Sequence, residues 1–229
     1  EDLVGVMTVP TQRKGTIAAI PTRKIATIRS FMIGNVSMST TTREDEVRTE
    51  LDNHADTCVV GDNTALVIHE FDQTVSVHGY TESIGAMKVK TVSAVVAYDH
   101  PETGDTYMLV IHQAILVPKL KSNLLCPMQL RDFDICVNDK PKYMVPIPTD
   151  DHHAIITPAV EGKESLCIPL LLHSVTSYFP MRKPTRQEYE QCEEGFRIEL
   201  MSESIERDPQ ATRFEEEEAS MLDDKGCLR

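Results

Sequence analysis

The sequence predicts an all-β domain in the middle of the chain. Three observations indicate this fold class: short stretches rich in Val, Ile and Thr recur, apolar and polar residues alternate within them, and Gly, Pro, Asp and Asn residues separate them. Segments with a helical period are short and few. A length of 229 residues leaves room for one domain of ordinary size with extensions, or for two small domains. Aromatic residues make up only 5% of the chain, so we expect an aliphatic core.

The expected strands lie between residues 47 and 137. Two long, nearly alternating stretches at residues 87–98 and 107–117 flank a loop with Pro and Gly, which predicts a β-hairpin that turns at residues 100–105. One short helix is expected within residues 124–131. These elements together predict a compact, mainly antiparallel β-domain. The other expected strands cover residues 47–52, 58–60, 65–69, 74–78 and 135–137.

We expect three regions along the chain: a leader at residues 1–44, the β-domain at residues 45–160 and an acidic linker at residues 161–229. The leader is rich in Thr, Ser and basic residues and has no persistent period, so we expect it to be disordered. The chain begins with Glu1 and Asp2 rather than Met, from which we expect a fragment of a longer protein.

The linker is expected to contain only short elements. A Pro-containing, basic stretch at residues 177–184 is expected to stay extended and solvated. A capping-box pattern at Thr185 and Glu188 predicts a short helix up to about Glu194. The acidic run at residues 215–218 can open a second short helix. None of these segments has a wide apolar face, so we expect a solvated spacer.

The composition excludes several classes of function. A net charge of −13, from 36 acidic and 23 basic residues, argues against direct binding of nucleic acid. No run of about 18 apolar residues exists, so we expect neither a membrane span nor an intact signal peptide. The six cysteines stand far apart without a Cys-x-x-Cys pair, which fits reduced thiols in a cytoplasmic protein better than a zinc ribbon or a disulfide scaffold. We therefore expect no cofactor and no metal.

Two stretches of the chain carry the pattern of an active site. The first reads Leu-Asp-Asn-His-Ala-Asp-Thr over residues 51–57, follows an expected strand and precedes an apolar pair and Gly61. It resembles the active-site loop of retropepsin-like aspartic proteases, in which these features occur in the same order. The second, residues 113–130, contains a strand, Pro118, a basic loop, Asn-Leu-Leu and a short helix. It resembles the end of the protease segment in copia-type retroelement polyproteins.

The two stretches are separated as this resemblance requires. About 70 residues lie between Asp52 and Asn123, which leaves room for the flap hairpin that the family places there. The resemblance covers residues 46–145 and implies a closed, retropepsin-like β-barrel with one short helix. It further implies an aspartic endopeptidase that cuts its own retroelement polyprotein, in the cytoplasm or within virus-like particles.

The implied chemistry needs two carboxylates that share one proton. Like charges a few ångströms apart cannot both be ionised, so one carboxylate acts as a base on a bound water while the other donates a proton to the peptide carbonyl. This chain offers a single motif, because Asp150 and Asp151 follow no apolar strand. The resemblance therefore implies a homodimer in which each chain supplies Asp52.

The resemblance assigns a role to each part of the expected site. Asp52 is the catalytic carboxylate, and the residues that follow it shape the loop. Asp56 is expected to position the substrate, or alternatively to cap a turn. The loop residues after Asp52 are Asn53, His54, Ala55, Asp56 and Thr57. The expected flap, whose sequence also suits an ordinary hairpin, contains Gly79, Tyr80, Ile84 and Gly85. The expected apolar wall beneath the two carboxylates consists of Leu124 and Leu125.

Three positions depart from the pattern of the family. Asn53 stands where the family has Thr or Ser, whose hydroxyl braces the loop across the dimer axis, and an amide can donate and accept in its place. His54 replaces the Gly at which the backbone approaches the carboxylates. Cys126 also stands where the family commonly has Gly. Three interpretations of His54 remain open: a substrate-side or proton-handling residue, a tolerated structural replacement, and a lesion in a decayed copy.

These departures leave two functions besides proteolysis. One is a catalytically inactive retropepsin-like module that dimerises or binds peptides, because an imidazole at residue 54 crowds substrate or partner. The other is a passive spacer within the polyprotein. A metal site built from His54 and Asp56 is disfavoured, since no third ligand stands at a suitable spacing.

Overall fold

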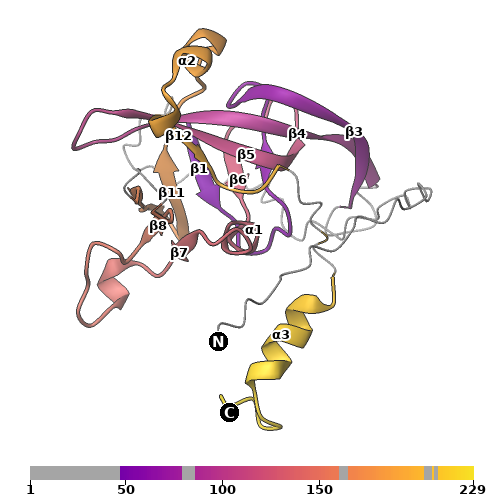
Figure 1. Cartoon of the computed structure of the whole chain (residues 1–229), viewed down its shortest axis with the longest axis vertical. Helices are drawn as coiled ribbons and strands as arrows, with labels where there is room; N and C mark the ends of the chain where they lie inside the picture. The colour runs from indigo at the N-terminus through magenta and orange to yellow at the C-terminus, as the bar shows by residue number, and fades with distance from the viewer. Residues whose placement is uncertain (1–46, 79–85, 160–164, 204–207, 209–210) are drawn as a thin grey trace, which may run out of the picture.

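The structure, a computed structural model, describes residues 47–78, 86–159, 165–203, 208 and 211–229. The expected leader and the four expected flap residues lie outside these ranges. In Figure 1, strands form the body of the described part, and helices α2 and α3 lie at opposite ends of the view.

Strands dominate the described residues and form two sheets. They are β1 (Arg48–Leu51), β2 (Val59–Val60), β3 (Leu66–His78), β4 (Ala86–Asp99), β5 (Thr106–Leu116), β6 (Asn123–Leu125), β7 (Cys136–Asn138), β8 (Ala154–Ile156), β9 (Cys167–Pro169), β10 (Leu171–His173), β11 (Thr176–Pro180) and β12 (Arg197–Glu199). The main sheet has the order β10-β11-β1-β6-β2-β5-β4-β3, with β12 also on β5, and the small sheet has the order β7-β8-β9. The predicted all-β class is confirmed. The pairing found among the described residues does not join β10 to β3, so the closed retropepsin-like barrel stays a prediction.

Three long strands form the antiparallel half of the main sheet. Strand β4 pairs with β3 along one edge and with β5 along the other. The predicted hairpin is confirmed: Asp99 pairs with Thr106, and Gly104 in the turn has a φ of 75°, which glycine adopts without strain. The two short strands expected before it are continuous in β3, and the pairing with β4 shifts between Glu70 and Thr74.

The core is mainly aliphatic, as the composition predicts. Leu109, Ile111 and Leu125 are completely buried within the largest apolar cluster. Two aromatic residues complete it, since Tyr98 and Phe179 pack edge to face with 5.9 Å between their ring centroids. Burial raises the pKa of Tyr98 to about 12, so this phenol keeps its proton at neutral pH.

The chain continues in the main sheet beyond the end expected for the β-domain. Strand β11 pairs antiparallel with β1, and Phe179 within it is completely buried. Strand β12 lies parallel to β5, and the Leu200 N–H donates to the Val110 carbonyl (2.9 Å). The expectation of an extended, solvated stretch at residues 177–184 is therefore wrong. Its buried residues are Phe179, Met181 and Pro184, and this run is too short and too irregular to be recognised by periodicity.

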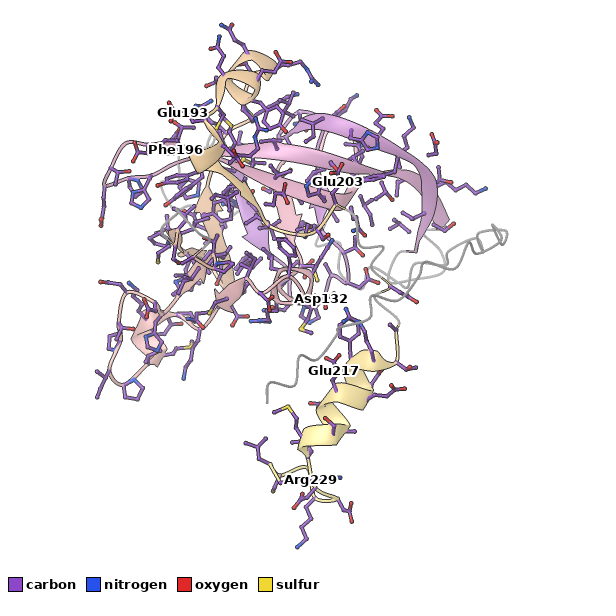
Figure 2. All side chains as sticks on the ribbon, viewed as in Figure 1. Asp132, Glu193, Phe196, Glu203, Glu217 and Arg229 are labelled. Atoms are coloured by element: carbon purple, nitrogen blue, oxygen red, sulfur yellow. The ribbon has the colours of Figure 1, made fainter. Side chains whose placement is uncertain are left out.

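Helices form where local signals predict them. Helix α1 (Pro127–Arg131) lies within the segment expected to be helical. Helix α2 (Arg186–Gln191) begins at the predicted capping box, in which Thr185 and Glu188 each bond the other's backbone N–H. Helix α3 (Arg213–Met221) buries none of its residues, and Figure 2 shows it standing clear of the sheets. In the ranges that the structure covers, no helix has the length and apolarity needed to cross a bilayer.

Candidate active site

The Asp52 loop, residues 52–58, joins two strands that a third strand separates. Strand β6 lies between β1 and β2, parallel to β1 and antiparallel to β2. Within β6, Leu124 is the register partner of Glu50 on one side and of Val59 on the other. The Asp52 loop therefore crosses the end of β6, at the point where the chain turns into α1.

One end of the Asp52 loop is hydrogen-bonded to the last residue of β6, and the other end is hydrogen-bonded to α1. The Asp52 N–H donates to the Leu125 carbonyl (2.9 Å), and the Cys58 N–H donates to Oε1 of Gln129 (2.8 Å). The Cys126 N–H in turn donates to the sulfur of Cys58 (3.2 Å). Because Cys58, Cys126 and Gln129 are buried, water does not compete for these bonds, and the ends of the loop are fixed.

A buried asparagine fixes the strand that leaves the loop. Oδ1 of Asn123 accepts hydrogen bonds from the Gly61 N–H (3.1 Å) and from Oγ1 of Thr64 (2.7 Å). A Cβ at Gly61 would lie 2.6 Å from Oγ1 of Thr64 and 2.9 Å from the Leu120 carbonyl oxygen, so only glycine fits there. Asn123, the first residue of the Asn-Leu-Leu stretch, therefore connects β6 to the residues that follow β2.

The two leucines expected in the apolar wall lie on opposite faces of β6. Leu125 is completely buried and shares its cluster with Leu51 and Ala55. Leu124 is half-buried and packs against a separate cluster that contains Val59. Leu125 therefore supports the Asp52 loop from beneath, whereas Leu124 belongs to the other side of the sheet.

The carboxylate of Asp52 is oriented by its own loop. Its Oδ1 accepts a hydrogen bond from the His54 N–H (2.9 Å), and its carbonyl accepts one from the Ala55 N–H (3.2 Å). These bonds form a tight turn of the kind that Asp favours. The Asp52 side chain is 15% exposed, so its carboxylate is held in place and still reached by solvent.

His54 lies beside Asp52 without filling the space around it. Its Nδ1 is 3.9 Å from Oδ1 of Asp52, and its side chain is 74% exposed. The imidazole forms an ion pair with the carboxylate when it is protonated. An ion pair this open to water contributes less than about 1 kcal/mol to stability. A single chain therefore accommodates a side chain at the position where the family has Gly.

The other loop residues are divided between surface and interior. Asn53 is exposed, and its Nδ2 donates to Oδ2 of Asp139 (3.0 Å). Ala55 and Thr57 are buried. Both carboxylate oxygens of Asp56 are also buried, although the residue as a whole is only partly covered. The substrate-positioning role of Asp56 stays a prediction.

Two residues that hold the loop were not assigned a role from the sequence. Gln129 lies inside the second stretch that resembles the family, and it is a polar residue buried next to Leu130 on a short helix, which indicates an internal hydrogen bond. Asp139 is 86 positions from its partner Asn53 and has no local pattern that points to the contact.

Neither ligand geometry nor similarity to known proteins assigns a function to this site. No group of three or more His, Cys, Asp or Glu side chains in the described ranges is arranged to hold a metal ion. Comparison of the chain with protein-family models, with curated proteins and with solved structures finds no match. The Asp52 loop, by its residues and its geometry, is therefore the feature of the chain that points to a function.

Proposed function

We propose that the chain is a retropepsin-like aspartic endopeptidase, the protease segment of a copia-type retroelement polyprotein, with Asp52 as its catalytic carboxylate. The position of Asp52 carries the proposal. The residue directly follows β1, its N–H is bonded to β6, and its carboxylate is held by its own loop while remaining 15% exposed. The order of elements supports it: β1, the Asp52 loop, β2, three long strands, β6 and α1 follow one another as the resemblance requires.

Peptide hydrolysis by this route requires a second carboxylate. Of two carboxylates that share a proton, the ionised one accepts a proton from the attacking water and the protonated one donates to the carbonyl oxygen. Asp52 stands in the only such motif of this chain. The proposed enzyme is therefore a homodimer, in which the two Asp52 loops face each other across a twofold axis inside a closed barrel.

The exposed side of the loop fits this arrangement. Asn53 and His54 are its exposed residues, so they are the ones that a second copy or a peptide meets. The proposed substrate is an extended segment of the same polyprotein, cut in the cytoplasm or within virus-like particles. The proposal involves no cofactor, nucleic acid or membrane.

Replacement of Asp52 by Asn tests the proposal. Asn has the same shape but cannot take part in proton transfer, so we expect cleavage of a polyprotein that contains this chain to slow by about 10²–10⁴-fold. The matched control is Asp72→Asn, at an exposed position on β3, which is expected to cleave at the wild-type rate. Product bands measure cleavage, and circular dichroism checks that both variants fold.

Each outcome of this experiment selects one function. Unchanged cleavage in Asp52→Asn removes Asp52 from the mechanism. A folded wild-type chain that dimerises and binds peptides without cutting them supports the inactive module instead. A chain that neither dimerises nor binds peptides supports the passive spacer.

A further inference from the structure

A hydrogen bond ties the Asp52 loop to a distant part of the same chain. The amide of Asn53, the residue after the proposed catalytic carboxylate, donates from Nδ2 to Oδ2 of Asp139 (3.0 Å). The resemblance implies a side chain at this position that reaches across the dimer axis. In this chain, the amide N–H is instead engaged within one protomer.

The acceptor stands on an anchored segment. Asp139 directly follows β7, where Asn138 pairs with Ala154 of β8. A guanidinium nitrogen (Nη2) of Arg131 in α1 donates to the Val137 carbonyl at 2.8 Å, which attaches β7 to α1. Helix α1 also bonds the far end of the Asp52 loop. The carboxylate of Asp139 is therefore fixed relative to the segment on which the loop rests.

The two oxygens of this carboxylate have different partners. Oδ2 accepts from Asn53, while Oδ1 lies 3.9 Å from a guanidinium nitrogen of Arg131. A charged acceptor makes a stronger hydrogen bond than a neutral one. Both partners are near the surface, so the contact contributes little to global stability. Its effect is local, on the freedom of the residue next to Asp52.

We infer that Asp139 is a positioning residue, which braces the Asp52 loop within a single protomer and orients Asp52 before a second copy binds. The catalytic consequence of the brace rests on the proposed function. Without the Asn53–Asp139 bond, the exposed side of the loop moves more freely beside the carboxylate. A displacement of about 1 Å in a catalytic group can slow a reaction by about 10²-fold.

Three variants separate the hydrogen bond from other effects. Asp139→Ala removes the acceptor. Asp139→Asn keeps an oxygen that accepts from Asn53 but removes the charge beside Arg131. Asp150→Ala is the matched control, because it removes an exposed carboxylate from the same β7–β8 connection, where its partner is Lys142 (3.5 Å).

Two readouts are measured on each variant. The first is amide hydrogen exchange at His54, whose N–H bonds to Asp52, in protein diluted until it is monomeric. We expect Asp139→Ala to speed this exchange about fivefold. The second is peptide cleavage by the concentrated protein, where we expect kcat to fall by about 10-fold or more and KM to change little. Asp139→Asn is expected to recover most of both losses, and Asp150→Ala is expected to match the wild type.

Several results would overturn the inference. One is wild-type exchange at His54 in Asp139→Ala, and another is an Asp139→Asn variant that is as impaired as Asp139→Ala. An effect seen only at concentrations where the chain dimerises would contradict a brace within one protomer. Changed exchange with unchanged kcat would remove the positioning role. If the wild type cleaves no peptide at all, the proposed function fails, while the exchange measurement still decides whether the brace exists.

Discussion

The Asp52 loop and the C-terminal strands join the same sheet by different means. Polar side chains hold the loop. Gln129 accepts a hydrogen bond from the Cys58 N–H at the end of the loop, and Asn123 accepts one from the Gly61 N–H just beyond β2. Strand pairing and apolar side chains hold β11 and β12 in the sheet. Phe179 in β11 and Leu200, which directly follows β12, are completely buried. The position of Asp52 and the stability of the sheet therefore depend on different contacts. Polar contacts determine where Asp52 stands, and apolar burial determines how strongly the sheet is held together.

A bulge between β4 and β5 brings further polar contacts into the main sheet. His112 and Gln113 of β5 stand opposite the single residue Ser93 of β4, which makes a β-bulge. Gln113 has a φ of 53°, and its side chain donates to the Ser202 carbonyl (2.9 Å) beyond β12. Nδ1 of His112 lies 2.8 Å from Oγ of Ser93, while its buried Nε2 has no hydrogen-bond partner within the described part of the chain. A proton added to His112 therefore meets no acceptor at Nε2.

The largest effect is expected from Phe179→Ala. The substitution leaves a cavity against Tyr98 in the main core, so the free energy of unfolding should fall by about 3–5 kcal/mol. Urea unfolding measures it. Val175→Ala, at an exposed apolar residue before β11, is the control and should change stability by less than about 0.5 kcal/mol. A cost below about 1 kcal/mol for Phe179→Ala would mean that β11 adds little to the core.

The next effect is expected from Asn123→Leu. Leucine has the same branched shape but removes the acceptor of the Gly61 N–H and the shorter of the two hydrogen bonds of the Thr64 hydroxyl, which should cost about 2–3 kcal/mol. Under conditions where both variants are fully folded, Asn123→Leu should slow peptide cleavage more than Phe179→Ala does. Exposed Asn63 provides the control Asn63→Ala. Equal cleavage by Asn123→Leu and Phe179→Ala would contradict the separation of position from stability.

A smaller effect is expected from pH. Burial is the main cause that lowers the pKa of His112 and the pKa of His153 from the ordinary value of 6.5, and for His153 Lys142 lowers the pKa further while Asp139 opposes the effect. Below pH 6.5 these two histidines are protonated more in the unfolded chain than in the folded chain. The free energy of unfolding should therefore decrease as the pH falls below 6.5. The limiting slope is about 1.4 kcal/mol per pH unit for each histidine. Urea unfolding between pH 7 and pH 5 measures this decrease.

The contribution of His112 is isolated by substitution. His112→Gln keeps a polar side chain without a titrating imidazole, so its stability should depend less steeply on pH than that of the wild type. Glu199 and Glu203 oppose the effect of burial, because their negative charges favour the protonated imidazole. His69→Gln, which removes an exposed imidazole from β3, is the control for the loss of a histidine. The same slope in all three proteins would exclude His112 as the source.

The smallest effect is expected from His54→Ala. The bond to Asp52 comes from the His54 backbone, which the substitution keeps, and the imidazole is largely exposed. Stability should therefore change by less than about 0.5 kcal/mol. The pH profile of cleavage then separates the interpretations of His54: a shifted profile identifies a proton-handling residue, and an unchanged one identifies a tolerated replacement.

The elements that could be predicted from the sequence are those whose causes are local. Alternation of apolar residues predicts β4 and β5, and the Pro- and Gly-containing loop at residues 100–105 predicts the hairpin between them. The capping box of Thr185 and Glu188 predicts the start of α2, because both of its hydrogen bonds join residues one turn apart. The stretch at residues 51–57 singled out the Asp52 loop for the same reason: its pattern is complete within a few residues.

Which distant segments meet could not be predicted from the sequence and is known from the folded chain. The fold places β6 between β1 and β2, β11 beside β1, and Asp139 against Asn53 over 86 positions of sequence. The neighbours of a residue along the chain determine its backbone preference, but the partner of a buried amide or of an edge strand depends on how the whole sheet packs. A short strand such as β11 has little pattern of its own. It is held by the apolar surface and the unpaired backbone groups that β1 offers once the rest of the sheet has formed.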